Sequence, residues 1–137
     1  MSQPEENEKD SGFPSGPWTG FYTQPGDRRF HRQSLDLTFR RGRMIGRGQD
    51  DIGAFLIGGH YDLESRRVWW TKSYPGSHSV YYSGVQQGRT IQGDWNIPPH
   101  YRGGFSIWPG GDSALDGEFF LEETRPLQVR LPALVED

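Results

Sequence analysis

The chain of 137 residues contains no cysteine. That absence excludes a disulfide framework, a thiolate metal site and a cysteine nucleophile. No apolar run approaches the roughly 18 residues that a membrane-spanning helix needs. The first ten residues, MSQPEENEKD, are acidic where a secretory signal is basic and then apolar. We therefore expect a soluble, cytoplasmic protein that does not engage a membrane.

Lysine is almost missing as well. The fifteen basic residues include only two lysines, Lys9 and Lys72. The formal charge is −3, but the excess of negative charge lies in the two ends of the chain. Residues 17–121 carry twelve basic and ten acidic side chains, so the middle of the chain is slightly basic. The acidic ends are typical of segments that keep a protein soluble.

Composition divides the chain into three parts. Residues 1–16 are polar and acidic and have too little apolar surface to offset the entropy of ordering, so we expect a disordered tail. Residues 17–123 have the length of one domain. Residues 124–137 form a C-terminal tail with an apolar stretch at 127–135, which we expect to dock on the domain or on a partner subunit.

Apolar residues recur with a period of two, and no long window shows the spacing of an amphipathic helix. A period of two is typical of strands with one buried face. The predicted strands are 18–23, 35–40, 43–49, 54–62, 66–74, 77–85, 89–97, 104–108 and 117–123. Most connections are short, which makes sequence neighbours pair antiparallel. The exception is a long predicted connection at 24–32.

Eight or nine such strands with one apolar face can close on themselves and so lose their exposed edges. We therefore predict an all-β fold, an antiparallel up-and-down barrel. The chain combines 19 glycines with five Trp, six Tyr and eight Phe. Glycines inside strands mark bends or close approaches, and large aromatic side chains can cover them. The predicted strand-interior glycines are Gly46, Gly48, Gly58, Gly59, Gly84 and Gly93.

Three stretches carry a family resemblance. The opening Gly16-Pro17-Trp18-Thr19-Gly20-Phe21-Tyr22 resembles the Gly-x-Trp-x-x-x-Tyr/Phe start of the streptavidin-like calycin barrels. Gly58-Gly59-His60-Tyr61 and Gly93-Asp94-Trp95-Asn96-Ile97 resemble later strands of that group. The likeness spans roughly residues 16–109 and lies in strand order and aromatic placement, so no biotin-binding residue is carried over. It implies a calycin-type barrel with a ligand cup at one mouth.

The two strands around Pro75-Gly76 contain the candidate site. Lys72 shares the phase of buried aromatic residues, although burying an unpaired charge costs several kcal/mol. Alternation on both sides of the turn predicts that Lys72, Tyr74, His78 and Tyr82 point into the cup, with Trp70 and Trp95 as walls. The ammonium of Lys72 would meet an anionic or carbonyl group of the ligand, and the tyrosines and His78 would form hydrogen bonds.

Two other interpretations of Lys72 stay open. A lysine with a lowered pKa can act as a base or form a Schiff base, whereas a lysine at the rim can reach water or pair with Asp50 or Asp51. These two carboxylates lie in the stretch GRGQDDIG, which we interpret as a turn whose Asp side chains accept backbone amides. Asp50 and Asp51 are therefore also predicted to reach the mouth of the cup.

Three functions are compatible with this pattern. The first is a non-enzymatic barrel that binds a small ligand in an aromatic cup. The second is a protein-interaction or structural barrel filled by its own side chains, and the third is a small enzyme that uses Lys72 or His78.

The histidines show no metal-ligand spacing, and we expect no metal or cofactor. Outward aromatic residues such as Trp69, Tyr81 and Phe120 favour a homodimer. A nearly neutral middle without a known nucleic-acid motif disfavours nucleic-acid binding.

Overall fold

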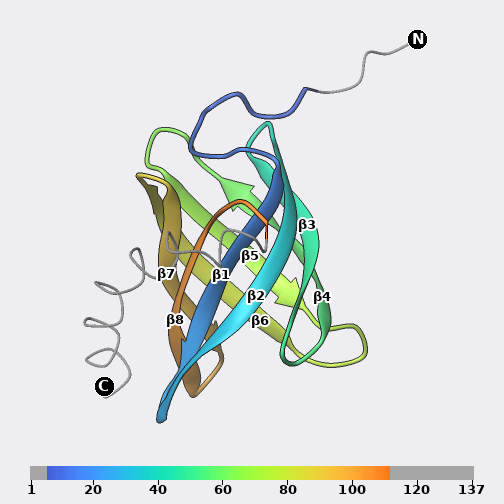
Figure 1. Ribbon diagram of the computed structural model, residues 1–137, viewed down its shortest axis with the longest axis vertical. Coiled ribbons are helices and arrows are strands. Elements are labelled where there is room, and N and C mark those ends of the chain that lie inside the picture. The colour runs from blue at the N-terminus through green and yellow to red at the C-terminus, as the bar shows by residue number, and fades with distance from the viewer. Residues whose placement is uncertain (1–5, 112–137) are drawn as a thin grey trace.

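Alternating apolar residues fold into a closed barrel in the computed structural model, which describes residues 6–111 (Figure 1). Each strand pairs antiparallel with its neighbours in sequence, and the last strand pairs with the first. The strands are β1 (Gly16–Gln24), β2 (Asp27–Arg40), β3 (Arg43–Asp50), β4 (Ala54–Tyr61), β5 (Arg67–Ser73), β6 (Ser79–Gln87), β7 (Thr90–Ile97) and β8 (Tyr101–Pro109). The predicted all-β up-and-down barrel is confirmed. Residues 6–111 contain no helix that is long and apolar enough to cross a membrane.

The first connection between strands is much shorter than the sequence predicts. The connection expected at 24–32 is only a turn at residues 25–26, because Gly26 adopts a φ of +76° and allows the chain to reverse at once. Strand β2 therefore begins at Asp27 and is 14 residues long. The strand expected at 117–123 and the tail at 124–137 lie outside the described residues.

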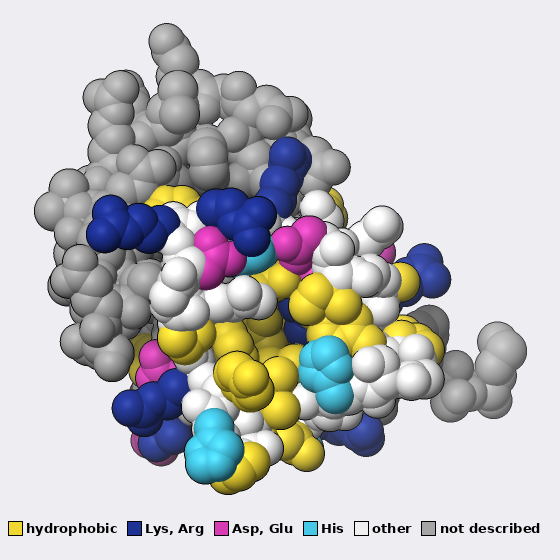
Figure 2. Space-filling view, turned by 90° about the horizontal axis from the view of Figure 1, so that it is seen from below, with side chains coloured by type: hydrophobic (Ala, Val, Ile, Leu, Met, Phe, Trp, Pro, Cys, Tyr) yellow, Lys and Arg dark blue, Asp and Glu magenta, His cyan; other side chains and the backbone are white. Residues whose placement is uncertain are grey.

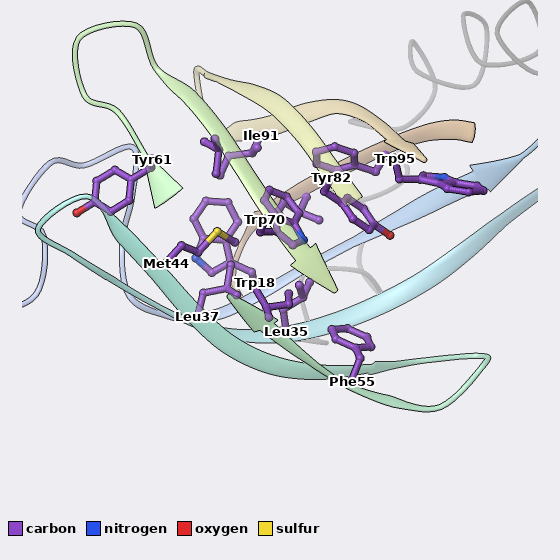
Figure 3. Packing of buried hydrophobic residues seen from close by; sticks show 14 of the residues in the cluster. Trp18, Leu35, Leu37, Met44, Phe55, Tyr61, Trp70, Tyr82, Ile91 and Trp95 are labelled. Carbon is purple, nitrogen blue, oxygen red and sulfur yellow. The ribbon is translucent and has the colours of Figure 1, made fainter. Parts of the chain in front are cut away.

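The interior of the barrel is filled by the inward phase of the strands. Figure 3 shows this core, in which Leu37, Met44 and Trp18 pack beneath Trp70 and Ile91. The fully buried side chains also include polar ones, among them Lys72 and Gln33. The burial of apolar surface stabilises the barrel by about 25 cal/mol per Å², whereas the buried polar groups need specific partners.

The glycines inside strands fit against aromatic side chains at three of the six predicted positions, Gly48, Gly59 and Gly84. A Cβ atom on Gly59 would lie 2.5 Å from the Cβ of Trp70, and a Cβ atom on Gly48 would lie 2.6 Å from the ring of Phe55. These distances are far below van der Waals contact, so a larger residue would displace the neighbouring strand or ring. Gly58 is different, because a Cβ atom there would meet nothing within 4 Å.

Residues 6–15 close one end of the barrel, which we call the closed end (Figure 1). Phe13 is fully buried there, with its ring centroid 4.8 Å from that of Tyr61 and 5.4 Å from that of Phe39. The guanidinium carbon of Arg66 lies 5.0 Å from the centroid of the Phe13 ring. One aromatic side chain thus anchors an otherwise polar segment.

Polar contacts hold the same segment in place. The backbone amide of Glu8 donates to the carbonyl of Phe39 over 2.8 Å, and the hydroxyl of Tyr61 donates to Glu8 Oε1 over 2.6 Å. Asp10 accepts from Arg66 at 2.8 Å, and these hydrogen bonds lower the pKa of Asp10 to about 2. The disordered tail predicted for residues 1–16 is therefore not what the structure shows for residues 6–15. Residues 1–5 lie outside the described residues.

Replacing Phe13 by alanine tests this closure. We expect Phe13→Ala to lower the free energy of unfolding by about 3–5 kcal/mol, because it empties a fully buried aromatic site. Urea denaturation followed by tryptophan fluorescence measures the loss. Tyr101→Ala, at a side chain that is 67% exposed, is the control and should change stability by less than about 0.5 kcal/mol. Equal effects of the two substitutions would show that residues 6–15 do not contribute to the fold.

Candidate ligand-binding site

The other end of the barrel, which we call the open end, carries the turns that join β1 to β2, β3 to β4, β5 to β6 and β7 to β8. Strand β5 runs toward this end and turns Val68, Trp70 and Lys72 inward, since alternate residues of a strand share one face. The side chain of Lys72 is only 1% exposed. A cation at such a position must be compensated by the residues around it.

Asp50 supplies the compensating charge. Its Oδ2 lies 2.5 Å from Nζ of Lys72, and the Asp50 side chain is fully buried. The ammonium also donates to Oε1 of Gln33 over 3.2 Å and to the hydroxyl of Tyr82 over 3.4 Å. Three oxygen atoms therefore match the three hydrogens of the ammonium.

The position of Asp50 follows from the turn that it begins. Its Oδ1 accepts the backbone amides of Ile52 at 2.9 Å and Gly53 at 3.2 Å, as the sequence predicts for this turn. Its Oδ2 accepts the hydroxyl of Tyr74 at 2.5 Å as well as the ammonium of Lys72. One carboxylate thus fixes both the β3–β4 turn and the end of β5.

Four aromatic rings surround the same ammonium. Nζ of Lys72 lies 4.2 Å from the ring centroid of Phe55 and 4.9 Å from that of Tyr22. The centroids of Tyr74 and Tyr82 are 5.4 and 5.5 Å away. Distances below about 6 Å allow cation–π attraction, which is strongest where water is excluded. The rings therefore stabilise the charged form of a lysine that the barrel has removed from water.

Burial and charge act in opposite directions on the pKa of Lys72 and in the same direction on the pKa of the tyrosines. Burial lowers the pKa of Lys72 below its usual value, and the carboxylate of Asp50 only partly counteracts that decrease. Burial also raises the pKa of Tyr74 and Tyr82 well above that of free tyrosine, and the negative charge of Asp50 adds to the increase. The phenols consequently remain protonated and able to donate hydrogen bonds.

A second polar cluster lies at the rim. His31 faces Asp51 through Nδ1 at 2.5 Å and Asp27 through Nε2 at 2.8 Å, and the hydroxyl of Tyr22 donates to Asp51 over 2.6 Å. Burial lowers the pKa of His31, but the hydrogen bonds to the two carboxylates outweigh it, so the pKa is raised overall. Residues 6–111 contain no group of three or more histidine, aspartate or glutamate side chains with a geometry that could hold a metal ion.

The open end is hollowed. Figure 2 looks into it and shows apolar side chains around a depression with a basic side chain at its bottom, while a histidine between two acidic residues marks the rim. Two residues before Lys72 in β5, Trp70 stacks on Tyr82 with ring centroids 5.0 Å apart. The indole nitrogen of Trp70 is buried and has no hydrogen-bond partner in the described part of the chain. The indole N–H of Trp70 is therefore a buried hydrogen-bond donor without an acceptor in residues 6–111.

The structure brings together most of the residues predicted from the sequence. Lys72, Tyr74, Tyr82 and Asp50 form the inner cluster, and Asp51 lies at the rim. Trp95 packs edge-on against Tyr22 and donates from its indole nitrogen to the carbonyl of Thr23 over 2.9 Å. The structure adds four buried residues that the sequence did not predict at this end of the barrel, namely Tyr22, His31, Gln33 and Phe55.

His78 does not join the cluster. It is exposed in the turn before β6, with Nδ1 3.1 Å from Oγ of Ser77. Its ring centroid lies 5.2 Å from that of Tyr74, outside the ion-pair network. Residues 74–78 form a turn and not a strand, so the alternation that predicted an inward His78 stops at Tyr74.

Comparisons of this chain with protein-family models, curated proteins and solved structures found no significant match. The coarse likeness to a calycin barrel therefore stands on the eight-stranded closed topology itself.

Removing one member of the buried ion pair tests its energetics. We expect Lys72→Met alone to lower the free energy of unfolding by about 3–5 kcal/mol, because Asp50 remains buried without a cation. The double variant Lys72→Met/Asp50→Asn should recover at least half of that loss, since a neutral amide still accepts the turn amides. Urea denaturation at pH 7 measures both. A double variant that is less stable than the single one would contradict the compensation.

The rim histidine predicts a pH dependence. A raised folded-state pKa means that the stabilisation by His31 is complete below its reference pKa of 6.5 and is lost as pH rises through the folded-state value. We expect the free energy of unfolding to fall over that interval in the wild type and to stay flatter in His31→Asn. Denaturation curves at successive pH values measure the slope. His78→Asn, at an exposed side chain, should retain the wild-type fall. If it removes the fall as His31→Asn does, the rim network is not responsible.

Proposed function

We propose that the open end binds a small, partly apolar molecule through a carbonyl or carboxylate group and carries out no reaction on it. The observation that carries the proposal is the ammonium of Lys72, which is buried near the open end among four aromatic rings. A charged donor inside an aromatic pocket is typical of a ligand site, where a few polar groups orient an apolar molecule. The resemblance to streptavidin-like barrels, which implies a ligand cup at one mouth of the barrel, supports a ligand site at this end.

The three contacts of the ammonium are unequal, and this gives a ligand access to it. The bond to Asp50 is short, whereas the distances to Gln33 and Tyr82 lie at the long end of hydrogen-bond geometry. A ligand oxygen can replace the two long contacts while the ion pair stays intact. The displaced amide of Gln33 and hydroxyl of Tyr82 are then free to bond to the same ligand.

The unused indole donor of Trp70 favours an acceptor group on the ligand. A buried donor without a partner costs about 1–3 kcal/mol, and a carbonyl or carboxylate oxygen near Tyr82 would supply one. The rings of Tyr22, Tyr74 and Phe55 would cover the apolar remainder of the molecule. Because Asp50 already balances Lys72, the site has no excess charge that demands an anion, and a neutral carbonyl compound suits it as well as a carboxylate.

The ion pair also supports binding over catalysis. A lysine must lose its proton before it can attack a carbonyl carbon. Burial lowers the pKa of Lys72, but the Asp50 carboxylate beside Nζ opposes the loss of its proton, and Tyr74 and Tyr82 remain phenols that cannot accept it. His78 is exposed outside the cluster and therefore adds no second reactive group beside Lys72. These features favour a ligand that is held and released unchanged.

A second candidate is a barrel whose interior serves only its own stability. The observation that favours it is that all three hydrogens of the Lys72 ammonium already have acceptors within the protein. On this alternative the aromatic residues at the open end would complete the core. It predicts that nothing binds there.

A matched set of probes separates the two candidates. The probes are 2-naphthoate, 2-acetylnaphthalene and 2-ethylnaphthalene, which share one ring system and differ in their oxygen atoms. Titrations followed by tryptophan fluorescence give the dissociation constants. We expect the two oxygen-bearing probes to bind at least about tenfold more tightly than 2-ethylnaphthalene, the effect of one hydrogen bond to a charged group.

Variants assign the binding to the open end. Lys72→Met/Asp50→Asn should abolish the preference for oxygen-bearing probes while keeping the fold. Arg67→Met, which removes an exposed cation, should leave the preference unchanged. Native mass spectrometry of the protein from its own host should reveal a retained small molecule. If no probe binds and no molecule is retained, the self-filled barrel is the correct description.

A further inference from the structure

The outward side of β3–β6 carries an apolar face that the described chain leaves uncovered. Ile45, Leu56, Trp69 and Tyr81 are 51%, 56%, 44% and 46% exposed. Together with Gly58, which lies among them, we call these residues the outer aromatic face. Large apolar residues clustered on one surface are typical of an interaction site, whereas scattered ones need no explanation.

Gly58 is the unusual member of this face. A Cβ atom there would meet nothing within 4 Å, and its φ lies outside the range that favours glycine. Among residues 6–111, neither packing nor backbone conformation therefore requires a glycine at this position, although glycine weakens a strand. Its lack of a side chain leaves a shallow pocket of about 390 Å³, to which Ile45, Trp69 and Tyr81 contribute. The glycine makes room on the outside of the barrel.

The strand register places this pocket symmetrically to a protruding side chain. Gly58 of β4 pairs with Thr71 of β5, and Thr71 pairs with Tyr81 of β6. Gly58 and Tyr81 thus lie one strand to either side of Thr71. A two-fold axis parallel to β5 and above Thr71 would bring Tyr81 of each copy over Gly58 of the other.

The next row of residues obeys the same symmetry. It runs from Arg43 through His60, Trp69 and Ser83 to Asp94, as the pairings of β3 with β4, β4 with β5, β5 with β6 and β6 with β7 show. Trp69 is central, and the two ends carry opposite charges on exposed side chains. The same axis would set Trp69 against its own copy, whereas Arg43 and Asp94 lie on β3 and β7, which the closed barrel places on opposite sides, so these two charges point away from the axis.

We propose that the outer aromatic face is the isologous interface of a homodimer of this chain. A two-fold interface must be complementary to itself. Here one axis matches a pocket with a protruding ring and sets the central indole of Trp69 against its own copy, and both matches lie on β4–β6. The occupant is therefore a second copy, and the interface does not involve the open end, so its test is independent of ligand binding.

The oligomeric state of the full chain tests the proposal. Light scattering after size exclusion, at tens of micromolar and without added ligand, should give the mass of a dimer. Gly58→Arg should give a monomer with an unchanged circular dichroism spectrum, because the new side chain has room on the outside of its own barrel. Tyr81→Ala should weaken the dimer at least about tenfold, as the loss of a buried aromatic anchor does. Tyr101→Arg, at an exposed aromatic residue outside this face, should leave the dimer unchanged.

Sedimentation velocity measures the dissociation constants of the wild type and of these variants. A wild-type monomer, or a dimer that survives Gly58→Arg, would overturn the proposal.

Discussion

An ammonium group inside a small barrel needs a compensating charge and three hydrogen-bond acceptors, and the open end is arranged around this requirement. Asp50 meets the charge and also anchors the β3–β4 turn through its second oxygen. Gln33 and Tyr82 provide the other acceptors, and Tyr74 shares the carboxylate. Because these contacts join β2, β3, β5 and β6, one ion pair connects strands on different sides of the barrel.

Strand β5 contributes to two surfaces of different character. Its even-numbered residues Trp70 and Lys72 face the interior, and its odd-numbered residues Trp69 and Thr71 face outward. Because of the period of two, this one strand of seven residues contributes Lys72 to the inner cluster and Trp69 to the outer aromatic face. Glycines mark both surfaces for different reasons: Gly59 makes room for Trp70 within the barrel, whereas Gly58 leaves space outside it.

Much of this arrangement could be predicted from the sequence, because alternation and turn residues specify antiparallel strands locally. Lys72 attracted attention as the single lysine of the barrel, and Asp50 as part of a turn. Gln33 and His31 were missed because Pro25-Gly26 looked like the start of a long connection, which hid the first half of β2. The closure by Phe13 was missed because composition averages over a segment, and one aromatic residue among acidic ones does not change the average.

The closure by residues 6–15 covers one end of the barrel, where Phe13 is fully buried. A molecule that binds at the open end, as we propose, would therefore enter and leave past the same rim. Its rates of entry and escape would be governed together by the turns of that rim and by the contact between His31 and Asp51, so that a change at the rim would alter both rates in the same direction.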